Sequence, residues 1–248
     1  MKTASASDYI SGRFRPESVW RQRSSMMEID ILYEDHQLMV CRKPAGVPVQ
    51  SAKIGAKDMV SVLRNYRKEK ENNPYIALVH RLDQPVQGVI VFAKTKEAAA
   101  HLSRQMTDGR MKKQYLAVVC GKPEQREARL VDYLLKDGRT NTSSIVREGT
   151  KGAKRAELIY RVRKEASEYT LVEIDLLTGR HHQIRVQMAG AGMPVAGDRK
   201  YNSGGGAKAA ETVALAAFRL GFSHPVTSKN MCFEAEPEGA LFDLFSNV

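Results

Sequence analysis

The sequence predicts an α+β domain whose β-sheet is mainly antiparallel and is flanked by helices. Short apolar runs rich in β-branched residues recur along the chain, bounded by glycine, proline and charged turns. Four of these runs follow one another between residues 128 and 177 with only short turns between them, which favours antiparallel pairing. Stretches with capping residues and helical spacing of apolar side chains lie elsewhere, and these predict the helices.

Size and charge narrow the class of protein. The chain has 248 residues, of which 42% are hydrophobic and 27% charged, as in ordinary globular proteins and unlike disordered or membrane chains. We interpret residues 1–26 as a basic N-terminal tail and residues 27–248 as one domain. No run reaches the roughly 18 apolar residues that span a bilayer, and no signal peptide begins the chain. We therefore expect a cytoplasmic monomer that does not bind membranes.

The balance of 39 Lys and Arg against 28 Asp and Glu gives a net charge of +11, which indicates a polyanionic partner. Nucleic acid is the first candidate, although charge alone does not separate RNA from DNA or from an anionic membrane surface. The three cysteines are scattered through apolar segments, which favours buried reduced thiols over a disulfide or zinc site. They are Cys41, Cys120 and Cys232.

The first third of the chain predicts a hairpin, a helix and a polar loop. Residues 29–43 form the hairpin, and Asp58 begins a helix that ends before Pro74. Ile76 to Val79 and Val89 to Phe92 are expected to be buried strands, with Asp83 in the loop between them. Taken alone, Asp83 fits a turn-forming aspartate that caps its own backbone. A carboxylate at such a position is also a candidate for chemistry.

The middle of the chain predicts a helix from the N-cap Thr95 to Gly109 and a strand over residues 114–119. A tyrosine on such a strand, here Tyr115, usually packs in a core with its hydroxyl satisfied. The strands that follow span residues 128–137, 143–147, 156–162 and 169–177. They carry cations that are either exposed strand ends or a track for RNA phosphates. These are Lys136, Arg139, Arg147, Lys151, Lys154, Arg155, Arg161, Arg163 and Lys164.

The last third predicts a helix over residues 180–189 with Ile184 and Met188 facing inward and Arg185 on the adjoining face. On that helix His181 and His182 would point about 100° apart, which makes them a poor metal pair. We expect no metal site. Residues 204–206 are three glycines that predict a flexible excursion. Closing strands are expected over 213–222 and 231–233, with a short helix over 238–245.

Three segments in order resemble the RluA family of RNA pseudouridine synthases. The first is His80-Arg81-Leu82-Asp83 with Gly88 and Ala93-Lys94, and the second is Lys112-Lys113-Gln114-Tyr115-Leu116-Ala117. The third runs from Gly179 to Met188 and continues with Gly192, Pro194, Gly197-Asp198 and Tyr201. The turn Lys43-Pro44-Ala45-Gly46 is similar to a further family motif. Together these segments are far more specific than any one of them.

The resemblance implies a mixed, mainly antiparallel sheet bent around a central cleft, in a stand-alone catalytic domain without an extra RNA-binding domain in front. It implies an isomerase that converts uridine in ribosomal or transfer RNA to pseudouridine and needs no cofactor. Asp83 would be the catalytic carboxylate, Arg185 its bidentate partner that keeps it ionised, and Tyr115 the ring beneath the uracil. The residues expected to bind substrate around them are His80, Arg81, Leu82, Gly88, Arg180, Gln183 and Ile184.

Some positions depart from the family pattern. Val86-Gln87 stand where Thr-Ser or Thr-Thr is usual, His181 stands at a common threonine, and Gln187 at a common histidine. Two other functions remain open from the residues. One is a non-catalytic RNA-binding protein on the same scaffold. The other is a metal-dependent nuclease that uses His80, Asp83 and His182, for which no further acidic ligands lie at motif spacing.

Overall fold

The computed structural model describes residues 29–52, 57–202 and 212–246. The predicted basic tail and the three glycines at 204–206 lie outside these ranges. Within the described residues, no helix is long and apolar enough to cross a membrane.

All the described strands belong to one sheet, in the order β1-β2-β4-β10-β5-β9-β8-β6-β7, with β3 paired to β4 and β11 to β10. Every pairing among them is antiparallel except β4 with β10. The predicted mixed, mainly antiparallel sheet is therefore confirmed. The strands are β1 Asp30–Glu34, β2 Leu38–Lys43, β3 Ala77–Leu78, β4 Gln87–Ala93, β5 Lys112–Cys120, β6 Glu127–Asp137, β7 Thr142–Val146, β8 Lys154–Ala166, β9 Tyr169–Leu176, β10 Leu215–Ser223 and β11 Asn230–Glu234.

The helices are α1 Met59–Lys68, α2 Lys96–Thr107, α3 Gln183–Gly190 and α4 Ala240–Asp243. Two of them begin at the predicted caps. The Asp58 side chain accepts from Ser61 N, and the Thr95 hydroxyl accepts from Ala98 N, so each satisfies a backbone donor that the first helical turn leaves open.

The centre of the sheet is covered on both faces, because side chains alternate along each strand. Met39 of β2 and Phe92 of β4 face a core that also contains buried residues of α1 and α3. Their neighbours Val40 and Val91 face a second core built with α2. A third, smaller core joins α4 to β5 and β10. The site residues discussed below lie on the face covered by α1 and α3.

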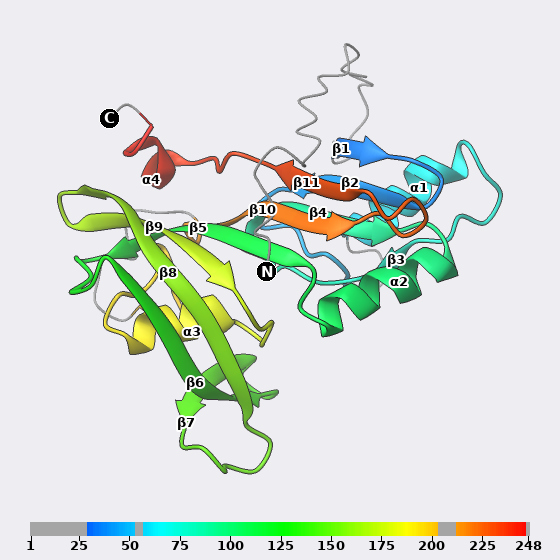
Figure 1. Cartoon of the computed structure of the whole chain (residues 1–248). Helices are drawn as coiled ribbons and strands as arrows, with labels where there is room; N and C mark the ends of the chain where they lie inside the picture. The colour runs from blue at the N-terminus through cyan, green and yellow to red at the C-terminus, as the bar shows by residue number, and fades with distance from the viewer. Residues whose placement is uncertain (1–28, 53–56, 203–211, 247–248) are drawn as a thin grey trace, which may run out of the picture.

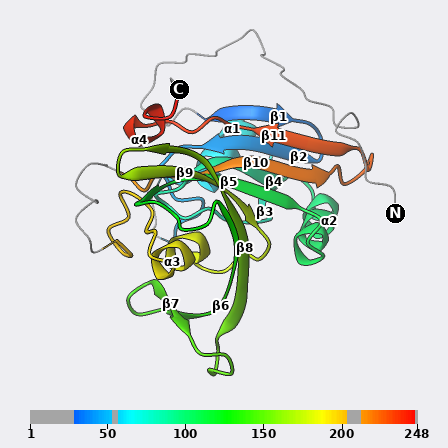
Figure 2. The same cartoon turned by 60° about the vertical axis from the view of Figure 1, so that its left-hand side comes forward.

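The sheet bends sharply across its width. In Figure 1, β1, β2, β4 and β10 form the upper part, while β6, β7 and β8 extend downward as an arm. Figure 2 shows α3 beside this arm, under the bend between the arm and the upper part. Residues far apart in sequence therefore meet where the sheet turns.

Two predicted elements differ in extent. The first strand of the central stretch is only the two-residue β3, which is half-buried rather than buried. Helix α3 begins at Gln183 instead of Arg180, because His182 adopts a left-handed backbone conformation with φ of 53° and supplies no side-chain cap. Residues 180–182 therefore form a turn before the helix. The apolar spacing at Ile184 and Met188 predicted the body of the helix correctly, but it gave no indication of the turn before it.

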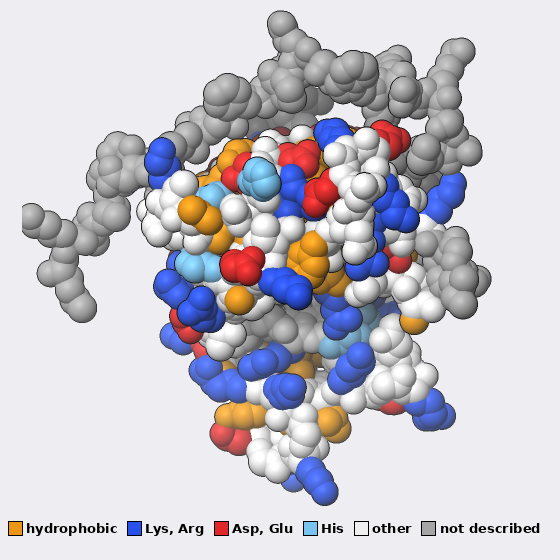
Figure 3. All heavy atoms as spheres, turned by 90° about the vertical axis from the view of Figure 1, so that its right-hand side faces the viewer, with side chains coloured by type: hydrophobic (Ala, Val, Ile, Leu, Met, Phe, Trp, Pro, Cys, Tyr) orange, Lys and Arg blue, Asp and Glu red, His pale blue; other side chains and the backbone are white. Residues whose placement is uncertain are grey.

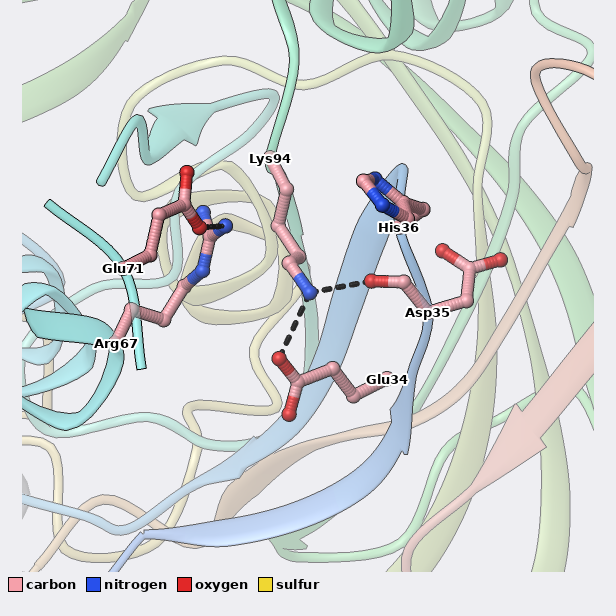
Figure 4. A pocket seen from close by; sticks show the side chains of 6 residues that line it. All are labelled: Glu34, Asp35, His36, Arg67, Glu71 and Lys94. Carbon is pink, nitrogen blue, oxygen red and sulfur yellow. Dashed lines mark hydrogen bonds and ion pairs between the residues drawn. The ribbon is translucent and has the colours of Figure 1, made fainter. Parts of the chain in front are cut away.

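A polar depression lies at the end of β4, on the side opposite its start at Gln87. Lys94 bridges it by donating to the Glu34 carboxylate at 2.8 Å and to the carbonyl of Asp35, as Figure 4 shows. Arg67 and Glu71 of the α1 region pair on its other side. Because β4 rises about 3.3 Å per residue over its seven residues, these charges lie far from the Asp83 loop. Lys94 ties the β1–β2 turn to the end of β4.

Gly88 allows β4 and β10 to approach each other. It has φ of +121°, and a Cβ at this position would lie 2.2 Å from the carbonyl oxygen of Ala217. Gly88 and Ala217 are paired in the one parallel contact of the described sheet. The glycine was predicted as a substrate-binding residue, and the structure gives it a packing reason as well.

Substituting Gly88→Ala is expected to lower the free energy of unfolding by roughly 2–5 kcal/mol, since it adds both a clash with backbone and an unfavourable φ. Urea denaturation measures this. Gly138→Ala is the matched control, because a Cβ there meets nothing within 4 Å and φ is not positive. Equal midpoints for the two variants would contradict the packing role of Gly88.

Candidate active site

The Asp83 loop is fastened to the turn that follows β2. Gly46 N donates to the Gln84 carbonyl at 2.9 Å, and Gln84 Nε2 donates back to the Gly46 carbonyl at 2.9 Å. Val86 N closes a turn onto the Asp83 carbonyl at 3.0 Å. These two backbone hydrogen bonds and one side-chain hydrogen bond fix the loop that carries Asp83 independently of any substrate.

Lys43 also joins the turn after β2 to the Asp83 loop. Its side chain is fully buried, and Nζ donates to the carbonyls of Pro44 and Gln84, both at 2.9 Å. Burial lowers the pKa of Lys43 to about 8, while attraction to Asp83 opposes that shift. The ammonium group is thus a buried positive charge close to Asp83. The family-like turn at 43–46 was noticed in the sequence, but no role for the lysine was predicted.

The predicted pairing of Asp83 with Arg185 is present in a weaker form. Arg185 Nη1 lies 3.4 Å from Asp83 Oδ2, so a single contact joins them. The bidentate partner of Arg185 is instead Asp198, with Nε to Oδ2 at 2.6 Å and Nη2 to Oδ1 at 2.8 Å. Asp198 is fully buried and Arg185 is 3% exposed. The prediction of a bidentate Asp83–Arg185 pair is therefore wrong, because a second carboxylate occupies the fork.

The charge balance at Asp83 also differs from expectation. Burial raises the pKa of Asp83 above its ordinary value, and the charge and hydrogen bond of Arg185 offset this only in part. The Asp198 charge raises the pKa further, and Lys43 lowers it. The carboxylate is 28% exposed, so solvent reaches it. Arg185 and Lys43 together favour its ionised form, whereas the sequence suggested Arg185 alone.

Tyr115 of β5 lies in the same core as Leu82 and Ile184. Burial raises the pKa of its hydroxyl, and the Asp83 charge raises it further, which places the two groups near each other. Within the described residues the Tyr115 hydroxyl makes no hydrogen bond, although the ring is only 7% exposed. A tyrosine with a purely structural role usually satisfies its hydroxyl. This one leaves its polar end available beside Asp83.

His182 is a further neighbour of Asp83 to which the preferred interpretation gave no role. Its Nε2 lies 3.7 Å from Asp83 Oδ2, and its Nδ1 lies 2.7 Å from the hydroxyl of Tyr201. Ser143 N of β7 donates to the same hydroxyl at 2.8 Å. Burial, together with the charge of Arg185, lowers the pKa of His182 to about 3, so the ring is neutral. A chain of contacts thus runs from β7 to the candidate carboxylate.

His181 stacks on His182 with ring centroids 3.7 Å apart. Its Nδ1 contacts Ser143 Oγ at 2.8 Å and its Nε2 contacts Asn141 Oδ1 at 3.1 Å. The expected divergence of the two rings on a helix is wrong, because both residues precede α3. His181, which stands where the family usually has threonine, therefore links β7 and the turn before it to the site.

The predicted substrate-binding residues divide by exposure. Arg81 and Arg180 are exposed, and Arg180 Nε is held by the Arg155 carbonyl at 2.8 Å. Leu82 and Ile184 are buried in the core under the site. The His80 imidazole accepts from Val91 N at 3.3 Å, and burial lowers its pKa to about 3.

Gln183 is buried, and its side-chain amide makes its hydrogen bonds to other groups of the protein. Its Oε1 accepts from the Thr178 hydroxyl at 2.8 Å and from Arg180 N at 2.9 Å. Its Nε2 donates to the Glu157 carbonyl at 3.1 Å and to Gln187 at 2.9 Å. The predicted contact of Gln183 with substrate therefore has a competing structural role, shared with Gln187.

Across the described residues, no three His, Cys, Asp or Glu side chains gather in an arrangement that would hold a metal ion. His80, Asp83 and His182, the ligands of the alternative nuclease, do not form such a group. The arrangement around Asp83 instead offers one accessible carboxylate, two nearby cations, a neutral imidazole and an aromatic ring.

Substituting Asp198→Asn is expected to lower the free energy of unfolding by roughly 3–5 kcal/mol, because it leaves the buried Arg185 without its charged partner. Urea denaturation followed by circular dichroism measures the loss. Asp108→Asn serves as control, since its pair with Arg110 is exposed and should contribute no more than about 1 kcal/mol. If the two variants lost equal stability, Asp198 would not be the anchor of Arg185.

Comparison with known proteins gives independent evidence about the family of this chain. Residues 37–190, which include Asp83, Tyr115 and Arg185, match the model of a family described as RNA pseudouridylate synthase. The chain is 33% identical over 211 residues to an uncharacterized RNA pseudouridine synthase, YhcT, of Bacillus subtilis, covering 84% of this chain and 68% of that protein. It is 35% identical over 221 residues to the ribosomal large subunit pseudouridine synthase C of Salmonella typhimurium, covering 85% and 67%.

Solved structures share the fold. Human RNA pseudouridylate synthase domain containing 1 aligns with a TM-score of 0.71 at 24% identity, covering 87% of this chain and 86% of that one. Human RNA pseudouridylate synthase domain containing 4 aligns with a TM-score of 0.70 at 22% identity, covering 87% and 90%. These alignments confirm the predicted α+β class and the bent sheet.

Proposed function

This chain belongs to the RluA family of RNA pseudouridine synthases, and we propose that Asp83 is the carboxylate with which it isomerises uridine in RNA. The observation that carries the proposal is the approach of Arg185 to Asp83 at 3.4 Å, beside the free hydroxyl end of Tyr115. The alternative of a non-catalytic RNA-binding protein has no comparable observation in its favour.

The reaction breaks the bond between N1 of uracil and C1′ of the ribose, turns the base, and joins C5 to C1′. The hydrogen on C5 leaves as a proton and N1 gains one, so atoms and electrons balance without an external oxidant or reductant. Ionised Asp83 would act on the sugar, either as nucleophile or as base. Tyr115 would lie beneath the uracil and hold it while it turns. A uridine in a helix must first be flipped out, at a cost of a few kcal/mol.

The two nearby cations support an ionised Asp83. Arg185 is fixed by Asp198, so its Nη1 points at the carboxylate without needing the substrate to position it. Lys43 adds a second positive charge that also attracts the Asp83 carboxylate. Exposed Arg81 is our candidate for filling the space of the flipped base or for gripping the phosphate beside it, because it stands next to the loop that carries Asp83.

We propose ribosomal RNA of the large subunit as the substrate, ahead of transfer RNA, because relatives at 31% to 35% identity bear that name. A ribosomal substrate is consistent with the cytoplasmic location expected from the sequence.

A basic arm supports RNA binding outside the site. We give this name to residues 136–154, from the end of β6 through β7 to the start of β8. Within the described part of the chain, no acidic side chain pairs with Lys136, Arg139, Arg147, Lys151 or Lys154. Figure 3 shows Lys and Arg side chains gathered over the lower half of one face, where the arm lies.

The remaining arginines of the expected phosphate track are neutralised within the sheet. Arg155 pairs with Glu157, Arg161 with Asp175, and Arg163 with Glu173. Lys164, the last cation of the expected track, donates to the Phe245 carbonyl at 2.8 Å. We therefore restrict the track to the basic arm, since cations that are already held within the protein release fewer counterions on binding RNA.

Substituting Asp83→Asn is expected to abolish isomerisation, lowering the rate roughly 1000-fold or more, because the amide cannot carry the charge. The measurement is tritium release from ribosomal RNA labelled at uracil C5, with Asp108→Asn as a control that keeps full activity. RNA affinity should be unchanged in both variants. Release by Asp83→Asn at the wild-type rate would refute the role, and absence of release by the wild type would refute the activity on that RNA.

Substituting Arg139→Gln or Lys151→Gln is expected to weaken RNA binding and to reduce the magnitude of the salt slope by about 0.7 to 0.9 each, because one phosphate contact is lost. Filter binding at several salt concentrations measures both. Arg126→Gln is the matched control, since Arg126 is exposed but paired with Glu165 outside the arm. The arm is not the contact surface if all three variants change the slope equally.

A further inference from the structure

We propose that His182 is a positioning residue that presents its Nε2 hydrogen to Asp83 Oδ2 and thereby leaves the other carboxylate oxygen free to react. The inference rests on the proposed function of Asp83 and deepens it. It is carried by the contacts that join Tyr201, His182 and Asp83.

The hydroxyl of Tyr201 determines which nitrogen of His182 carries the hydrogen. Ser143 N donates to Tyr201 Oη at 2.8 Å, so the hydroxyl is already an acceptor there. Its own hydrogen needs an acceptor, and among the described residues His182 Nδ1, at 2.7 Å, is the one in reach. A neutral imidazole that accepts at Nδ1 carries its hydrogen on Nε2. That hydrogen is on the side of Asp83.

The ring is held so that this nitrogen cannot turn away. His181 stacks against it at 3.7 Å and is itself anchored by Ser143 and Asn141. The backbone at His182, which directly precedes α3, is left-handed, with φ of 53°. Such a conformation is uncommon for a residue other than glycine and is retained where the surroundings enforce it.

Within the described residues, Asp83 Oδ2 has one hydrogen-bond donor and a second N–H group close by, whereas Oδ1 has no hydrogen bond. Arg185 Nη1 lies 3.4 Å and His182 Nε2 3.7 Å from Oδ2. The longer distance exceeds a hydrogen bond, but contacts of this kind often tighten only when substrate binds. A carboxylate held by one oxygen directs the other toward the substrate.

The groups around His182 keep it neutral and define what a pH experiment reports. The titratable or charged groups that face it are Asp83, His181, Arg185, Asp198, Lys200 and Tyr201. Burial and the positive charge of Arg185 lower the pKa of His182 to about 3, so His182 stays uncharged wherever Asp83 is ionised near neutral pH. The acid limb of the rate profile therefore reports Asp83.

The test compares His182→Gln with His182→Phe. Glutamine retains an N–H donor near the position of Nε2, whereas phenylalanine retains the ring that stacks on His181 but has no donor. We expect His182→Phe to lower kcat by about 10–100-fold with KM changed less than about threefold, and His182→Gln to recover most of that loss. The acid limb of kcat should move to higher pH in His182→Phe. A residue that only packs would give the opposite order, with phenylalanine the more active variant.

A measurement without substrate separates this inference from the proposed function. Carbon-13 NMR of the Asp83 carboxyl should show its pKa higher in His182→Phe than in the wild type, and near the wild-type value in His182→Gln. Nitrogen-15 NMR should find the His182 hydrogen on Nε2 in the wild type and a mixture of tautomers in Tyr201→Phe, which also serves if His182→Phe does not fold. An unchanged Asp83 titration or a hydrogen on Nδ1 overturns the inference, even if the wild type forms pseudouridine. An inactive wild type with the expected spectra overturns the proposed function instead.

Discussion

The buried pair of Arg185 and Asp198 is the contact on which the site depends. Its two hydrogen bonds of 2.6 and 2.8 Å satisfy a guanidinium that would otherwise be an uncompensated charge in the core. Asp198 also accepts from the backbone of Lys200 and Tyr201. One carboxylate therefore shapes the turn that carries Tyr201 and aims Arg185 at Asp83.

Asp83 is surrounded by two kinds of group: the charged side chains of Arg185 and Lys43, and the uncharged N–H of His182. Arg185 and Lys43 bring full positive charges toward Asp83, but burial and the Asp198 charge oppose them, and the pKa of Asp83 remains above its ordinary value. A neutral His182 beside the carboxylate adds no charge that would repel the cations. Since buried like charges are costly, a neutral N–H group fits beside Arg185 at Asp83 Oδ2 better than a further cation would.

Local sequence patterns predicted most of the fold, because caps and apolar spacing act over a few residues. Asp58, Thr95 and the run of antiparallel strands illustrate this. The family resemblance added Asp83, Tyr115 and Arg185 as a group. It did not reveal that Asp198 occupies the fork of Arg185, because that preference depends on distances across the folded core. The left-handed turn at His182 could not be predicted for a related reason. His182 contacts Tyr201 and His181 there, and these contacts form only in the folded protein.

The parallel contact between β4 and β10 has a consequence for how the protein is made. Gly88 and Ala217 pair directly, yet β10 comes from the last part of the chain. A nascent chain still lacking β10 would leave the Gln87–Gly88 end of β4 unpaired on that side, since β3 pairs only with Phe92 and Ala93 at the other end. The loop that ends at β4 would then lack its final support. Support for the Asp83 loop is thus a late, long-range step of folding, because it requires β10 to have been synthesised and to have paired with β4.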